Sequence, residues 1–136
     1  MRTHRLCVGL ISDTHGLLRP EALAELRGSD LIVHAGDVGS AEILDVLRAV
    51  APTFAVRGNV DRGPWAESLP TTAVVDAGSH QLYVLHILDD LDLAPEAASF
   101  SAVISGHTHR PHAEARREVL YLNPGSAGPR GASGCP

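Results

Sequence analysis

The sequence predicts a single domain of the α/β class, and three observations lead to that prediction. The 136 residues suffice for one hydrophobic core but are few for two. The first half alternates short apolar runs with amphipathic segments, as expected of parallel strands joined by helices. After Pro70 the pattern changes to paired apolar runs around turn residues, which is typical of antiparallel hairpins. We therefore expect residues 1–136 to form one domain with an added antiparallel part.

The first half begins with a strand, a helix and a second strand. Residues 5–12 (RLCVGLIS) are apolar without clean alternation, which indicates a buried strand. Residues 20–27 are expected to form a short helix, because proline suits the first helical turn and glycine follows the last. Residues 30–37 (DLIVHAGD) form a second apolar run and predict a second buried strand.

A second helix and a third strand complete this parallel unit. Ser40 is placed to cap a helix that extends to residue 50, because serine is a favoured N-cap residue. The apolar residues of this segment recur at helical spacing: Ile43, Leu44, Leu47 and Val50. Residues 53–59 (TFAVRGN) predict the third strand, so the order is strand, helix, strand, helix, strand.

The second half predicts two hairpins with a helix and a strand between them. Residues 71–86 carry two apolar runs around a Gly-Ser turn. A short helix is expected at 95–98, a strand at 102–106, and a second hairpin at 112–123. Residues 127–136 are rich in Gly, Ala, Ser and Pro, and we expect them to fray.

Composition excludes several classes of function. A formal net charge of −5 argues against nucleic acid held on a basic surface. The longest apolar runs have the length of strands, so no segment is expected to span a membrane. Residues 1–5 do not resemble the start of a secretory signal. Cys7 is expected to be a buried free thiol, and Cys135 lies near the end, so we predict no disulfide framework and a cytoplasmic location.

Asp, Asn and His side chains follow five of the predicted strands, each at the point where the strand ends. The carboxyl ends of strands in an open α/β sheet converge on one crevice, where ligands bind. We therefore expect seven side chains to point into one small volume: Asp13, His15, Asp37, Asn59, His86, His107 and His109.

Metal ions explain this cluster better than a bare cleft does. Mixed nitrogen and oxygen ligands suit Mn, Fe, Zn, Co or Ni, and we take manganese as the first choice. Seven ligands are too many for one ion but suit two if a carboxylate such as Asp37 bridges them. Two metals about 3.5–4 Å apart form a clamp for in-line displacement at phosphorus, with a bridging water that becomes hydroxide. The ions would also offset the negative charge of the chain at the site.

The ordered motifs resemble those of the calcineurin-like metallophosphoesterases, specifically the small bacterial and archaeal phosphodiesterase branch. The chain carries DTH, GD, GNVD, LH and GHTH in the family's order, followed by NPGS. The resemblance covers nearly the whole chain and implies a four-layer α/β/β/α sandwich. It implies that one metal is held by Asp13, His15, Asp37 and His109, and the other by Asp37, Asn59, His86 and His107. We also expect Asp37 and Asn59 to be the catalytic residues.

The chain departs from the family pattern at two places. Many relatives have a histidine after the asparagine, which acts on the leaving group, whereas this chain has Val60. General acid catalysis, typically worth 10²–10⁴-fold, would then be missing or come from another group. Relatives usually continue past NPGS with strands that complete the second sheet, so we expect this sandwich to be incomplete at its C-terminal edge, with an unpaired strand.

Several other polar residues have two interpretations from sequence. Arg57, Arg62 and Arg110 flank the motifs and could either steer a phosphate or lie on the surface. Asp61 could either orient a neighbouring group or be a solvated turn acid. His34 lies within an apolar strand and is expected to be buried and hydrogen-bonded. His112, close to GHTHRP, could touch substrate, although a surface position is the simpler interpretation, and His80 and the acidic segment 89–92 are expected to be solvated.

The sequence therefore predicts a metal-dependent phosphoesterase, with a phosphodiester as the preferred substrate. The expected partners are two divalent metal ions and a small phosphate ester, with neither nucleic acid nor membrane, and homo-oligomer formation stays open. The alternative is an interaction scaffold of the same fold, comparable to a eukaryotic retromer subunit. Val60 favours this alternative, whereas seven potential ligands count against it.

Overall fold

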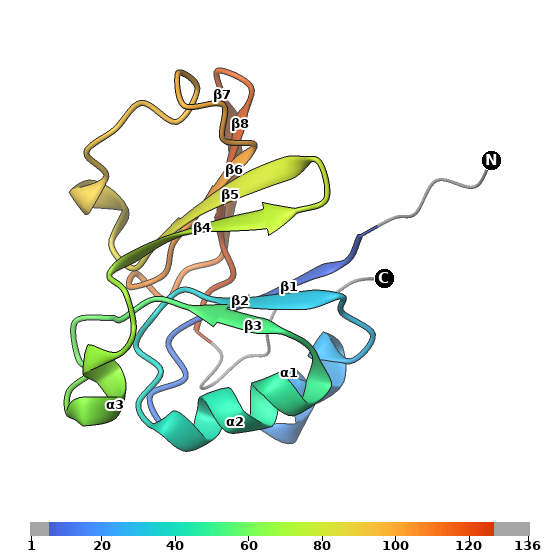
Figure 1. Cartoon of the computed structure of the whole chain (residues 1–136), viewed down its shortest axis with the longest axis vertical. Coiled ribbons are helices and arrows are strands. Elements are labelled where there is room, and N and C mark those ends of the chain that lie inside the picture. The colour runs from blue at the N-terminus through green and yellow to red at the C-terminus, as the bar shows by residue number, and fades with distance from the viewer. Residues whose placement is uncertain (1–5, 127–136) are drawn as a thin grey trace.

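A parallel sheet of three strands forms the first half of the fold in the computed structural model, which describes residues 6–126 (Figure 1). Its strands are β1 (Val8–Ile11), β2 (Leu31–His34) and β3 (Thr53–Ala55), in the order β1-β2-β3. Ile11 pairs with His34, and His34 pairs with Ala55. The three strands therefore end side by side, and the loops that follow them leave from one edge.

Three helices cover the face of this sheet that lies away from the second sheet (Figure 1). They are α1 (Pro20–Leu26), α2 (Ala41–Val50) and α3 (Pro64–Glu67). The apolar stripe of α2 buries Ile43, Leu44 and Leu47, as its periodicity predicts. The sequence prediction missed α3. This helix has only four residues, and the proline at its first position is the only helix signal that they carry.

A mixed sheet of five strands forms the second half, in the order β4-β5-β6-β8-β7. Its strands are β4 (Thr72–Ala77), β5 (His80–Leu85), β6 (Ala102–Ile104), β7 (His112–Arg116) and β8 (Val119–Asn123). The pairs β4–β5 and β7–β8 are antiparallel hairpins, as predicted. Between them, β6 runs parallel to both β5 and β8. The strand β6 thus joins the two hairpins into one sheet.

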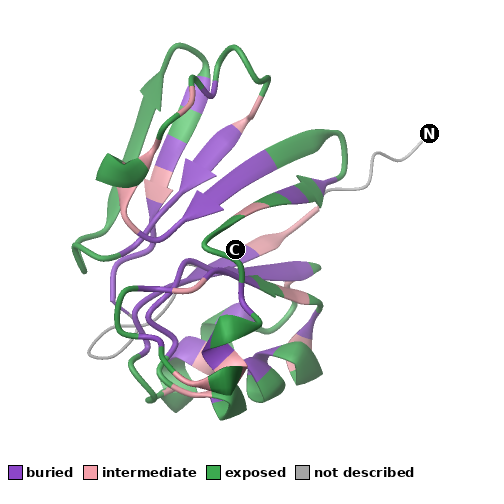
Figure 2. Cartoon of the chain, turned by 60° about the vertical axis from the view of Figure 1, so that its left-hand side comes forward, coloured by how far each residue is buried: buried purple, intermediate pink, exposed green. Residues whose placement is uncertain are grey.

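Three apolar clusters hold the layers together. One lies between the first sheet and its helices, and another lies between the two sheets, with Val33 and Val84 fully buried. The buried residues concentrate along these two layers (Figure 2). On the outer face of the second sheet, the 3-10 helix η1 (Leu88–Asp90) and residues 91–100 cover Tyr83 and Tyr121. The predicted α/β fold with two packed sheets is confirmed.

Two local predictions are wrong, and a third is confirmed only in part. Residues 95–98 form hydrogen-bonded turns rather than a helix, with Ala98 N–H donating to Ala94 at 3.1 Å. Ser40 is the N-cap residue of α2 and the helix ends at Val50, as predicted, but the Ser40 side chain makes no capping hydrogen bond. Cys7 is half-buried and disulfide-bonded rather than a buried free thiol. The only other cysteine of the sequence, Cys135, lies outside the described residues, as does the predicted frayed segment 127–136.

Within residues 6–126, no helix has both the length and the apolar character needed to cross a bilayer.

Candidate metal centre

The seven predicted ligands lie on the loops that leave the carboxyl ends of the strands. Six of them form two groups of three, and the ligand atoms of each group lie within 4.8 Å of one another. One group is Asp13, His15 and His109; the other is Asp37, His86 and His107. The structure therefore brings together side chains separated by most of the sequence, while their role as ligands stays a prediction.

In the first group, two imidazole nitrogens converge on one carboxylate oxygen. Asp13 Oδ1 lies 3.2 Å from His109 Nε2 and 3.7 Å from His15 Nε2. The two Nε2 atoms are 3.3 Å apart. Neutral imidazoles turn lone pairs toward one another at this distance only when a proton or a cation lies between them. This arrangement suits a metal ion.

Asp37 of the second group also lies near the first group. Asp37 Oδ2 lies 3.1 Å from His86 Nε2 and 3.8 Å from His15 Nε2, so this oxygen faces both groups. Asn59, the seventh predicted ligand, approaches the second group through Oδ1, which is 3.2 Å from His107 Nδ1. The position of Asp37 between the groups is the one that a bridging carboxylate needs.

The surrounding hydrogen bonds orient the ligand atoms. His86 Nδ1 lies 2.8 Å from the carbonyl oxygen of Ala35, so Nδ1–H donates a hydrogen bond to this oxygen and Nε2 keeps a free lone pair. Asp13 Oδ2 accepts hydrogen bonds from the Ser12 hydroxyl and from His107 N–H, at 3.0 Å in the latter case. These contacts occupy one atom of each side chain and turn the other toward the centre.

The atoms turned toward the centre are the ones left without partners. Three buried side-chain atoms among the described residues lack a hydrogen bond, and two of them are Asp13 Oδ1 and His86 Nε2. A buried polar atom without a partner is costly, and a group with such atoms in a native site needs an explanation. A divalent cation would satisfy both atoms, so the residues present fit the predicted metals.

Five of the seven predicted ligands have backbone conformations that L-residues adopt rarely. Asp13, His15, Asp37, His107 and His109 have φ between 48° and 71°. Such residues cost free energy and persist where the surrounding structure enforces them, which is common at functional sites. No pattern in the sequence predicts these positive φ angles.

Close backbone approach explains the glycines of the motifs. A Cβ at Gly58 would overlap the backbone and carboxylate of Asp37, and one at Gly36 would lie 2.8 Å from His86 Nδ1. The loops after β2 and β3 can approach this closely only because glycine, which has no side chain, occupies positions 36 and 58.

Asp61 links the two loops that carry Asp37 and Asn59. Its side chain is buried and accepts hydrogen bonds from the N–H groups of Val38, Gly39 and Gly58, at 3.2, 2.9 and 2.9 Å. Of the two interpretations that the sequence left open, the structure supports the orienting one. Asp61 faces backbone amides rather than solvent.

His34 is a buried structural residue, as predicted. Its Nε2 lies 3.0 Å from the hydroxyl of Thr14, a neighbour of Asp13 and His15, and its Nδ1 accepts a hydrogen bond from Gly36 N–H at 3.1 Å. Burial lowers the pKa of His34 to about 3, an effect that the charge of Asp61 only partly opposes. The ring is therefore neutral at physiological pH.

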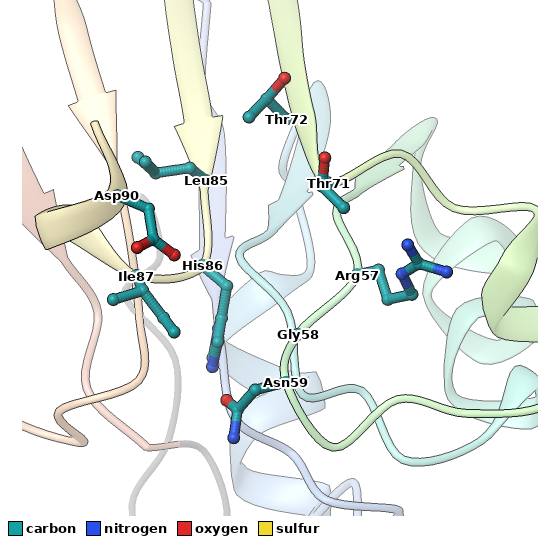
Figure 3. A pocket seen from close by; sticks show the side chains of 9 residues that line it. All are labelled: Arg57, Gly58, Asn59, Thr71, Thr72, Leu85, His86, Ile87 and Asp90. Atoms are coloured by element: carbon teal, nitrogen blue, oxygen red, sulfur yellow. The ribbon is translucent and has the colours of Figure 1, made fainter. Parts of the chain in front are cut away.

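The other candidates lie away from the centre or at its rim. His80 and His112 are exposed, as predicted, and contact Ser101 and Glu114. Arg57 lines a pocket beside Asn59 and His86 (Figure 3), whereas Arg62 and Arg110 are exposed. Val60, at the position where many relatives have histidine, is 45% exposed and its N–H donates to Asp37 Oδ1 at 3.0 Å.

Comparison with known families gives a match over nearly the whole chain. Residues 6–135 match the calcineurin-like phosphoesterase superfamily domain. A probable metallophosphoesterase of Methanocaldococcus jannaschii is 36% identical, over 89% of this chain and 68% of the relative.

Comparison with solved structures shows the same fold. A protein described as a novel archaeal phosphodiesterase superposes with a TM-score of 0.75 at 23% identity, over 90% of this chain and 86% of its own. Vps29 of Entamoeba histolytica, solved in complex with zinc, gives a TM-score of 0.72 at 23% identity, over 90% of this chain and 76% of its own.

Proposed function

Because this chain belongs to the calcineurin-like phosphoesterase superfamily, we propose that it hydrolyses phosphodiesters with the aid of two divalent metal ions. Asp13, His15 and His109 would hold one ion, and Asn59, His86 and His107 the other, with Asp37 shared between them. When bound, the two ions would supply a hydroxide for in-line attack at phosphorus and would stabilise charge on the phosphate oxygens. Manganese remains our first choice of metal.

The observation that carries this proposal is the shared position of Asp37. Its Oδ2 faces His86 Nε2 at 3.1 Å and His15 Nε2 at 3.8 Å, one from each group. Its Oδ1 is held by Val60 N–H. One oxygen of this carboxylate is thus held by the backbone, and the other faces ligand atoms of both groups. This arrangement supports a pair of ions rather than a single one.

The chain's own residues orient this centre. The carbonyl of Ala35 selects the tautomer of His86, and Asp61 fixes the spacing of the loops that carry Asp37 and Asn59. Neither Val60 nor any other aliphatic group can donate a proton to the leaving alcohol. We therefore expect aryl esters, which have good leaving groups, to be hydrolysed faster than alkyl esters, whichever alcohol the protein binds best.

The first experiment compares a chromogenic phosphodiester with its monoester analogue, using metal-stripped protein with Mn²⁺ added back. Diester hydrolysis that requires the metal would support the proposal. Asp37→Asn should lose at least about 100-fold in kcat/KM, since removing even a residue that orients a ligand costs 10–100-fold. It should also bind fewer ions. Asp45→Asn, on the exposed face of α2, is the matched control. Full metal content and activity in Asp37→Asn would contradict the proposal.

A second candidate function is an interaction scaffold with weak or no catalysis. Val60 favours it because the position offers no proton donor, and the structural likeness to Vps29 shows that the fold occurs outside proteins described as esterases. Two ions bound at the predicted ligands, with neither diester nor monoester hydrolysed, would favour this candidate.

A further inference from the structure

We propose that a pocket beside the metal centre binds the alcohol group of the substrate and selects neutral alcohols that carry free hydroxyls, such as glycerol or ribose. This inference rests on the proposed function, because the pocket shares His86 and Asn59 with the predicted second metal site. The cavity has a volume of about 350 Å³. That size lies at the lower end for small-molecule sites and suits a group as large as a sugar.

The walls of this pocket are tied to one another through the backbone. Arg57 N–H donates to the carbonyl of Pro70 at 2.7 Å, which joins the loop carrying Asn59 to the start of β4. Across the hairpin, Thr72 on β4 pairs with Leu85 on β5. These links hold Thr72 next to the strand end that carries His86, so the pocket exists without a ligand.

A third link places a carboxylate at the pocket. Asp90 N–H donates to the carbonyl of Ile87 at 3.0 Å and closes the turn of η1. Asp90 and Ile87 then lie on the same side of the pocket as His86, and the Asp90 carboxylate extends toward the His86 side chain (Figure 3). The wall of the pocket beside His86 therefore carries a carboxylate.

The polar groups of the pocket suit hydroxyls better than charged groups. The Asp90 carboxylate only accepts hydrogen bonds, whereas the hydroxyls of Thr71 and Thr72 both donate and accept. A substrate hydroxyl can donate to the carboxylate while it accepts from a threonine. The side chains of Leu85 and Ile87 supply apolar contact for the carbon atoms of the same group.

The distribution of charge argues against a second phosphate in the pocket. Such a group would meet the Asp90 carboxylate at close range, where like charges repel. The Arg57 side chain extends away from His86 (Figure 3), and its guanidinium has no hydrogen bond or ion pair within residues 6–126. The pocket should therefore disfavour alcohols that carry a terminal phosphate.

The test measures binding rather than turnover, with phosphonates that cannot be hydrolysed. We would titrate metal-loaded protein by calorimetry with propylphosphonate and with 2,3-dihydroxypropylphosphonate, which differ only by two hydroxyls. The dihydroxy compound should bind about tenfold tighter, the gain expected of a hydrogen bond to a charged group. Asp90→Ala should remove this preference. Asp89→Ala is the matched control: Asp89 is exposed on the same turn and does not line the pocket, so the preference should persist.

Two further ligands define the substrate class. Ribose carrying a phosphonate at C5 is compared with 2,3-dihydroxypropylphosphonate. The ligand that binds more tightly shows whether the pocket prefers a sugar or glycerol. Propane-1,3-bisphosphonate should bind more weakly than propylphosphonate, and Asp90→Asn should reduce that difference. Equal binding of propylphosphonate and both hydroxylated ligands would overturn the proposal. So would tight bisphosphonate binding that Arg57→Ala removes.

Failure of the proposed function would look different. Metal uptake and hydrolysis of bis(4-nitrophenyl) phosphate, measured on the same preparations, report on the centre alone. Hydrolysis without any preference for hydroxyls contradicts the pocket and leaves the function intact. A preference for hydroxyls without hydrolysis contradicts the function and leaves the pocket intact. Absence of both metal uptake and phosphonate binding contradicts both.

Discussion

At the residue scale, the centre is defined by atoms that the rest of the protein leaves unsatisfied. Asp13 and His86 each have one side-chain atom engaged by a hydrogen bond and another that is buried and makes no hydrogen bond. The engaged atom fixes the orientation of the side chain, and the other faces the centre. The ligands are thus oriented by the protein before any ion arrives.

Val60 is the residue at which substitution should increase activity. Its side chain is 45% exposed at the rim of the centre, so Val60→His should fold normally, and its backbone N–H can still hold Asp37 Oδ1. A histidine there supplies the missing proton donor, and we expect hydrolysis of an alkyl phosphodiester to increase at least about tenfold, a cautious figure for general acid catalysis. Steady-state kinetics on alkyl and 4-nitrophenyl diesters measures the effect.

The control for this change is Val60→Asn, which is polar but cannot act as a general acid. The gain should be confined to poor leaving groups and should follow the protonated form of the new histidine as pH varies. An equal gain in both variants would show that polarity, rather than proton donation, is responsible.

At the scale of elements, the centre depends on how loops at the ends of strands are tied together. The loop after β2 carries Asp37, the loop after β3 carries Asn59, and the buried carboxylate of Asp61 accepts amide hydrogen bonds from both. A carboxylate that accepts hydrogen bonds from three amide N–H groups is strongly stabilised. A side chain that also donates hydrogen bonds replaces it poorly.

Asp61→Asn should therefore weaken metal binding although Asp61 is not itself a predicted ligand. The amide NH₂ would face backbone N–H groups and separate the two loops, and we expect a loss of about 10–100-fold in metal affinity, as for other residues that orient ligands. Calorimetric titration with Mn²⁺ measures it. Asp76→Asn, exposed on β4, should leave the affinity unchanged. Unaltered affinity in Asp61→Asn would mean that the loops keep their spacing without this link.

At the scale of the whole molecule, the two sheets must pack together for the centre to form. Asp13, His15 and Asp37 come from the first sheet, whereas His86, His107 and His109 come from the second. Between the sheets lies an apolar cluster that includes Val33 and Val84. The free energy that holds the sheets together also holds the ligands together.

Stability should fall in acid because His34 is buried as a neutral ring. Below the ordinary pKa of 6.5 the unfolded chain takes up a proton at His34, while the folded protein does not do so until about pH 3. Between pH 7 and about pH 5 this difference lowers the unfolding free energy by roughly 2 kcal/mol. Urea unfolding in EDTA at several pH values measures the dependence.

His34→Gln should be less stable at pH 7 but should lose correspondingly less stability between pH 7 and about pH 5. His80→Gln is the control, because His80 is exposed on β5 and its removal should leave the pH dependence close to that of the wild type. Identical pH dependence in His34→Gln and the wild type would mean that other groups cause the acid sensitivity.

The sequence by itself determined the fold class, most of the strands and helices, and the identity of the candidate ligands. Each of these features rests on local chemistry: apolar spacing in the segment around Leu44, a Gly-Ser turn between two strands, and polar residues such as Asp37 directly after a strand. Such patterns follow from backbone geometry within a few residues. The division of the strands into two sheets and the order of the strands within each sheet do not follow from such local geometry.

Only the tertiary structure decided which distant groups meet. The order β4-β5-β6-β8-β7 and the burial of Asp61 depend on partners far away in the chain. The same holds for the left-handed backbone of the predicted ligands and for the pocket that Asp90 lines. Local spacing constrains neighbours in the sequence, whereas long-range contacts are selected by the packing free energy of the whole chain, which no single segment contains.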